Sequence, residues 1–130
     1  MPLSIGRPAP VEGWVDGAGK TIDLLQAAGN KPFLIVCSSP GSGPGKASMK
    51  SVERLKNKLP VYVVGAGIKD PDGTRMHALS PPGSPMFYLI GANGKVAGLW
   101  FGYDAPKAAE FEAAVISAEQ RRPVRIAELG

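Results

Sequence analysis

Three short apolar runs dominate the hydropathy pattern of the chain and predict buried β-strands. Residues 33–37, 61–64 and 86–90 are almost continuously apolar and do not alternate with polar residues, which is typical of strands covered on both faces of a sheet. The Asn-Gly pair at 93–94 is the strongest hairpin signal in the chain and predicts a return strand over about 95–101.

Helical spacing of apolar residues occurs before, between and after these strands. Thr21 is expected to cap a short helix that Gly29 ends. A second helix follows the first predicted strand, and its buried side would carry Met49, Val52, Leu55 and Leu59. Asp104 is expected to cap a last helix, whose buried side would carry Ala108, Phe111, Val115 and Ala118. Residues 1–20 and 65–84 show no clear apolar period and are expected to be loops rich in turns.

The order of these elements predicts an α/β fold. A strand, a helix and a second strand imply a right-handed parallel crossover, and the Asn-Gly hairpin adds an antiparallel edge. A mixed central β-sheet with helices on both faces satisfies these constraints, and this is the arrangement of the thioredoxin-like fold. We expect a single domain over residues 1–130, with its core over about 5–120 and a tail over 121–130.

The composition restricts the chemistry of the chain. Its 17 glycines and 13 prolines among 130 residues approach the level of disordered chains, but the apolar runs require a core. The one cysteine, Cys37, excludes an internal disulfide and a site built on several thiolates, and the one histidine, His77, excludes a histidine-rich metal site. We therefore expect no metal and no cofactor.

The apolar runs are also too short for a membrane span, which needs about 18 to 20 residues. The first ten residues lack the basic start and apolar middle of a signal peptide. We expect a cytoplasmic protein, or the soluble domain of a processed precursor.

The net charge of +4 is concentrated in one predicted helix. Four cations recur there every four residues and would form one basic face, made of Lys46, Lys50, Arg54 and Lys58. A solvated outer face is the simpler interpretation. The alternative is a contact with an acidic partner, an anion or nucleic acid. No aromatic residue is interleaved with the cations, which argues against nucleic acid.

Several segments resemble the redoxin group, which comprises peroxiredoxins of the AhpC/TSA type and the TlpA/ResA-type thiol–disulfide proteins. Ile5-Gly-Arg-Pro-Ala-Pro10 resembles their entry segment. Pro85-Met-Phe-Tyr-Leu-Ile-Gly-Ala-Asn-Gly-Lys-Val96 is similar to the segment that carries their cis-proline, a buried strand and a hairpin. The strand ending near Cys37 and the later Val52-Glu-Arg-Leu55 match the region around their active site. The resemblance implies a thioredoxin-like fold over about residues 5–120.

The same resemblance places the family's Cys-x-x-Cys motif on Ser42-Gly43-Pro44-Gly45. In such enzymes the first thiol lies at a helix N-terminus that stabilises its thiolate, and the second resolves the mixed disulfide. Ser42 cannot ionise there and Gly45 has no side chain. The resemblance therefore implies a thioredoxin-like module with a degenerate active site.

The Cys-x-x-Cys loop and the cis-proline loop of redoxins together grip an extended polypeptide. The corresponding residues here are Ser42, Gly43, Pro44, Gly45, Ser84 and Pro85, with a cis bond between the last two. The expected partner is another protein or an extended peptide, bound by strand addition without a covalent bond.

Two enzymatic alternatives remain open. In the first, the chain is a redoxin-type oxidoreductase or peroxidase that uses Cys37 or a thiol supplied by a partner. The simpler interpretation is that Cys37 is buried and behaves as a small apolar residue. Ser42 could be a nucleophile activated by His77, although an ordinary helix cap and a surface histidine are simpler.

Overall fold

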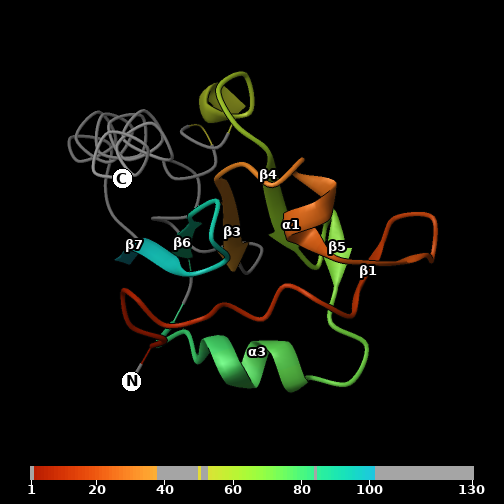
Figure 1. The fold of residues 1–130 in the computed structure, drawn as a ribbon. Helices are drawn as coiled ribbons and strands as arrows, with labels where there is room; N and C mark the ends of the chain where they lie inside the picture. Colours follow the sequence, from red (N-terminus) through yellow and green to blue (C-terminus); the bar gives the residue numbers. More distant parts are fainter. Residues whose placement is uncertain (1, 38–49, 51–52, 84, 102–130) are drawn as a thin grey trace.

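The computed structural model describes residues 2–37, 50, 53–83 and 85–101, and seven strands of this part form one sheet (Figure 1). The strands are β1 (Trp14–Asp16), β2 (Thr21–Ile22), β3 (Phe33–Cys37), β4 (Val61–Val64), β5 (Ile68–Lys69), β6 (Met86–Ile90) and β7 (Val96–Phe101). Their order across the sheet is β2-β1-β5-β4-β3-β6-β7. The β3–β4 and β4–β5 pairs are parallel and the other pairs are antiparallel. The mixed sheet and the parallel crossover expected from the sequence are confirmed.

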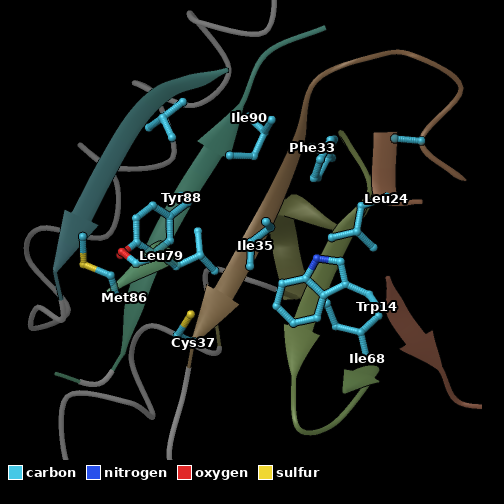
Figure 2. Close-up of a cluster of buried hydrophobic side chains, with 12 residues drawn as sticks. Trp14, Leu24, Phe33, Ile35, Cys37, Ile68, Leu79, Met86, Tyr88 and Ile90 are labelled. Atoms are coloured by element: carbon cyan, nitrogen blue, oxygen red, sulfur yellow. The ribbon is translucent and has the colours of Figure 1, made fainter. Parts of the chain in front are cut away.

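Strand β3 lies inside the sheet and separates two apolar clusters. All five of its residues are buried, as its continuous apolar run predicts. Phe33, Ile35 and Cys37 face the first cluster (Figure 2), which also contains Trp14, Leu24, Ile68, Leu79, Met86, Tyr88 and Ile90. Leu34 and Val36 face the second cluster, with Leu55, Leu59, Phe87 and Leu89. The period of two along the strand thus divides the core between the two faces.

Helical segments cover both faces, as expected. Helices α1 (Leu24–Ala27) and α3 (Thr74–Leu79) contribute Leu24 and Leu79 to the first cluster. Residues 50 and 53–55 are helical, and this segment contributes Leu55 to the second cluster. The N-terminal stretch runs alongside α3 (Figure 1), where Leu3 N–H donates to the Leu79 carbonyl at 2.9 Å.

The hairpin predicted at Asn93-Gly94 joins β6 to β7. Gly94 has a φ of 79°, a conformation that favours glycine, and Asn93 Oδ1 accepts from Lys95 N–H at 3.0 Å. The ladder pairs Leu89 with Gly98 but Ile90 with Val96, so one extra residue lies in β7. This β-bulge allows β7 to keep its pairing with β6 on both sides of the irregularity.

Two expectations for the N-terminal region are wrong. Residues 1–20 are not only a loop, because Trp14–Asp16 forms β1 and Trp14 is fully buried. Thr21 does not cap a helix, because it belongs to β2 and pairs with Val15. Asp23 caps α1 instead, and its Oδ1 accepts from Gln26 N–H at 3.1 Å. A turn at Gly17 and Ala18 joins β1 to β2.

The expectation of a loop over 65–84 is also wrong. This region contains β5 and α3, which attach to the core through the buried side chains of Ile68 and Leu79. Elements with a single buried anchor leave too few apolar residues for a period to be visible. The predicted last helix from Asp104 and the tail over 121–130 lie outside the described residues, as do Met49 and Val52 of the second helix.

Candidate functional site

The ends of two central strands meet at the edge of the sheet where the sequence places the binding groove. Cys37, the last residue of β3, pairs with Met86, the first residue of β6, and also with Val64 at the end of β4. Pro85 is buried directly before β6. The segment after Cys37 and the segment before Met86 therefore start from neighbouring points.

Most of the predicted groove lies beyond these two points. Ser42, Gly43, Pro44, Gly45 and Ser84 are outside the described residues, and so is the bond expected to be cis before Pro85. Pro85 is the groove residue whose position the structure gives. The register of β3 and β6 brings the flanks of the two loops together.

Cys37 is closed off from solvent. It is 4% exposed, and Figure 2 shows it at the end of β3 beside Tyr88 and Met86 of β6. Its Sγ lies 3.8 Å from Met76 Sδ of α3. Burial raises the pKa of the thiol from 9.0 to about 12, so the thiol is protonated near neutral pH. This environment is opposite to that of a reactive cysteine, which is partly exposed and electropositive.

Tyr88 lies beside Cys37 and was not singled out from the sequence. Its hydroxyl donates to the Leu79 carbonyl at 2.8 Å in a buried position. Burial and the neighbouring Cys37 raise the pKa of Tyr88 to about 12. A tyrosine with such a pKa keeps its proton at neutral pH, and its role is to satisfy a buried carbonyl. Its place in the apolar run 86–90 was the one sequence signal of its burial.

His77 lies in the last turn of α3 and is exposed. Ser42, its proposed partner, is outside the described residues, so pairing of the two remains a prediction. The described residues contain no group of three or more histidine, cysteine, aspartate or glutamate side chains that could hold a metal ion.

Arg75 forms a polar network that sequence reasoning missed. Its Nη1 donates to Asp70 Oδ1 and Asp72 Oδ1, both at 2.9 Å, and its Nε donates to the Glu12 carbonyl at 2.6 Å. The Asp70 side chain is only 4% exposed and also accepts from Met76 N–H at 2.8 Å. A buried carboxylate of this kind requires such partners. The network fixes α3 to the N-terminal segment, and no local pattern in the sequence indicated it.

Hydrogen bonds and charges of this network also shift two pKa values. Hydrogen bonds from Thr74, with the charge of Arg75, lower the pKa of Asp72. The hydrogen bond to Asp70 and the two carboxylate charges raise the pKa of Arg75. Both groups therefore stay charged over a wide pH range, which suits a structural role.

A hollow of about 350 Å³ lies between the N-terminal segment and α3. Its lining residues are Ala9, Pro10, Val11, Glu12, Thr74, Arg75 and Ala78. The opposite side of α3 carries Met76 and Leu79, which pack on the sheet. The hollow is thus on the outer side of α3, and its wall includes Arg75, whose Nη1 and Nε already have partners.

The basic face predicted on the second helix is exposed where the structure describes it. Lys50, Arg54 and Lys58 are exposed, while Leu55 and Leu59 are buried. Lys46, its first member, lies outside the described residues. The amphipathic pattern expected of this helix is confirmed for residues 53–59.

Comparison with solved structures shows the fold. A thioredoxin-like protein from Porphyromonas gingivalis superposes with a TM-score of 0.65 at 15% identity, covering 88% of this chain and 94% of that chain. The chain has a thioredoxin-like fold. A structure described as thiol:disulfide interchange protein DsbE, from Chlorobium tepidum, shares this fold with a TM-score of 0.69 at 18% identity, covering 89% of this chain and 98% of that chain. The redoxin-type fold implied by the sequence resemblance is confirmed.

Sequence comparison adds one curated relative of this thioredoxin-like chain. The thiol:disulfide interchange protein DsbE homolog of Paracoccus denitrificans is 36% identical over 107 residues, which cover 78% of this chain and 56% of that protein. The chain thus spans about half the length of the curated relative it matches. No protein-family model matches the chain. Within the described residues, no helix is long and apolar enough to cross a membrane.

Proposed function

We propose that this thioredoxin-like chain is a redox-degenerate binding or accessory module that holds another protein or an extended peptide without a covalent bond. The observation that carries the proposal is the state of Cys37. The only cysteine of the chain is 4% exposed, and its thiol has a pKa of about 12. A fold shared with thiol–disulfide proteins thus contains a thiol that is buried and protonated.

Thiol–disulfide exchange needs groups that this chain does not supply. The attacking group is a thiolate, and with a pKa of about 12 the Cys37 thiol is almost entirely protonated at pH 7. The resolving step needs a second cysteine, and the sequence has one. In the proposed alignment Ser42 and Gly45 occupy the positions of the reactive pair.

The geometry of the sheet edge supports binding. The end of β3 and the start of β6 are adjacent, so the proposed groove has one wall after Cys37 and one wall at Ser84 and Pro85. A partner strand would bind through backbone hydrogen bonds, with side-chain pockets adding selectivity. The proposed groove residues are Ser42, Gly43, Pro44, Gly45, Ser84 and Pro85. We further propose one domain over residues 1–130, acting in the cytoplasm or as part of a processed precursor.

The test uses an extended polypeptide that has no free thiol. Fluorescein-labelled insulin B chain, reduced and carboxymethylated, is titrated with the protein and followed by fluorescence anisotropy. We expect binding that is unchanged by dithiothreitol and by Cys37→Ala. Gly43→Trp fills the proposed groove and should weaken binding at least about tenfold.

Gly17→Trp is the matched control, because a Cβ at Gly17 would meet nothing within 4 Å and its hairpin joins β1 to β2, away from the proposed groove. It should bind the probe as the wild type does. Absence of binding by the folded wild type, or equal loss in Gly17→Trp and Gly43→Trp, would overturn the proposal.

The similarity to a DsbE homolog favours one competing function. In this alternative Cys37, or a thiol on a partner, performs redoxin-type reduction of a disulfide or a peroxide. It requires that Cys37 leave its contact with Met76 before it reacts. Turnover of insulin disulfides or of hydrogen peroxide that Cys37→Ala abolishes would establish it.

A further inference from the structure

The exposed basic face of the chain lies on the side of the sheet opposite to α3. Lys50, Arg54 and Lys58 are exposed, and the same segment packs on the second apolar cluster through Leu55 and Leu59. The apolar side chains fix the segment to the sheet and leave the cations in solvent. The basic face thus has a firm support, which lowers the entropy lost when a partner binds.

Basic residues outnumber acidic residues in this segment. Among the described residues of 50–59 the one acid is Glu53, and its Oε1 pairs with Lys56 Nζ at 2.9 Å. Lys50 and Lys58 form no ion pair with any described residue. The segment therefore presents a local excess of positive charge.

Two acidic residues follow within the described part of the chain, and both are held elsewhere. Asp70 and Asp72 precede α3 and are paired with Arg75. Helix α3 packs on the first cluster through Leu79, whereas the basic segment packs on the second through Leu55. These carboxylates therefore belong to the other side of the sheet. Neither carboxylate pairs with the basic face, whose positive charge favours an acidic partner.

We infer that the face formed by Lys50, Arg54 and Lys58 binds an acidic segment of a partner protein. The inference deepens the proposed function, since it rests on that function for the partner being a protein. Three cations contact few phosphates, and residues 50–59 contain no aromatic side chain on which a base could stack. A run of glutamates or aspartates matches this face better than nucleic acid does.

The test compares two double variants that change the net charge equally. Lys50→Glu with Lys58→Glu reverses two charges of the basic face, and Lys20→Glu with Lys31→Glu reverses two exposed charges elsewhere. The probes are a fluorescein-labelled 20-residue poly-L-glutamate and a labelled 20-nucleotide oligothymidylate, measured by anisotropy at low and at physiological salt.

We expect the wild type to bind poly-L-glutamate with an affinity that falls as salt is added. The basic-face variant should bind it at least about tenfold more weakly, and the control variant within about threefold of the wild type. Equal losses in the two variants would show that net charge alone acts, and would overturn the inference. Oligothymidylate binding that is tighter than poly-L-glutamate binding and is lost only in the basic-face variant would assign the face to nucleic acid, which also overturns it.

The groove variant separates this inference from the proposed function. Gly43→Trp should bind poly-L-glutamate like the wild type, since the basic face is unchanged. Failure of the insulin B chain to bind would contradict the proposed function alone. Failure of poly-L-glutamate to bind would contradict the basic-face inference alone.

Discussion

The thiol of Cys37 lies 3.8 Å from the thioether sulfur of Met76, and this contact links the end of β3 to α3. Met76 is itself held in place, because its N–H donates to the buried Asp70 carboxylate. The weak S–H donor of Cys37 is thus directed at a side chain inside the protein. Cys37 is therefore part of the core that fixes α3 on the sheet.

Cys37 should resist alkylation in the native protein. The thiol is 4% exposed, and its burial keeps it protonated. Iodoacetamide at pH 8 should therefore label the folded protein at least about 100-fold more slowly than the chain unfolded in urea. Intact-mass spectrometry over time gives both rates. Complete labelling of the folded protein within minutes would contradict the assigned environment.

Stability should decrease at alkaline pH through Cys37. Its folded pKa is raised from 9.0 to about 12, so the fold favours the protonated thiol. The stability that the protonated Cys37 contributes is fully present below about pH 9 and is lost as the pH rises toward 12. Tyr88, raised from 10.0 to about 12, acts in the same direction.

The Cys37→Ala variant isolates the thiol from the tyrosine. Near pH 7 its free energy of unfolding should be about 1 to 2 kcal/mol lower than that of the wild type, because packing around the thiol is lost. Its stability should nevertheless fall less steeply than that of the wild type between pH 9 and 11, as measured by urea midpoints. Parallel pH profiles for the two proteins would show that the Cys37 thiol does not titrate as described.

Gly13 should tolerate no side chain because Arg75 lies against it. A Cβ at Gly13 would overlap Arg75 Nη2, and the residue has a φ of +82°. Gly13→Ala should displace the guanidinium from buried Asp70 and destabilise the protein by several kcal/mol, about 3 or more. Gly19→Ala is the control, since its φ is +83° but nothing lies within 4 Å of the added Cβ.

Backbone strain alone should lower the stability of Gly19→Ala by about 1 to 2 kcal/mol. The difference between the two alanine variants in urea unfolding therefore measures the contact with Arg75. Equal losses would mean that Arg75 moves away at no cost, and that its network does not fix α3.

The Tyr88 hydroxyl should contribute modestly to stability. The Leu79 carbonyl accepts from Tyr88 Oη at 2.8 Å and from Leu3 N–H at 2.9 Å, so it keeps one partner in Tyr88→Phe. We expect a loss of about 1 kcal/mol in urea unfolding with the fold unchanged. A loss above about 3 kcal/mol would indicate that the contact of Leu3 does not persist on its own.

The sequence alone predicted the central strands of the sheet but not the short strands toward its edge. Strands β3, β4 and β6 were predicted because each is a continuous apolar run, and the Asn93-Gly94 turn then predicted β7. Strands β1 and β5 have three and two residues, and each contributes one buried anchor, Trp14 or Ile68. A single apolar residue gives no period.

The candidate site shows the same division. The burial of Cys37 followed from its place in an apolar strand, but its contact with Met76, 39 residues further along, could not be predicted from local pattern. The Arg75 network joins Glu12 to residues 70–76 and was equally invisible. The positions of Ser42 and Gly45 come from the family resemblance, and they remain predictions.

Restoring the cysteine pair tests the central claim most directly. Wild type, Cys37→Ala and the double variant Ser42→Cys with Gly45→Cys are compared in the reduction of insulin disulfides by dithiothreitol, followed by turbidity. We predict no acceleration by the wild type or by Cys37→Ala. The double variant should form an internal disulfide that dithiothreitol reduces, and should accelerate the reaction. Acceleration by the wild type that Cys37→Ala abolishes would contradict the claim that this fold has lost its thiol chemistry.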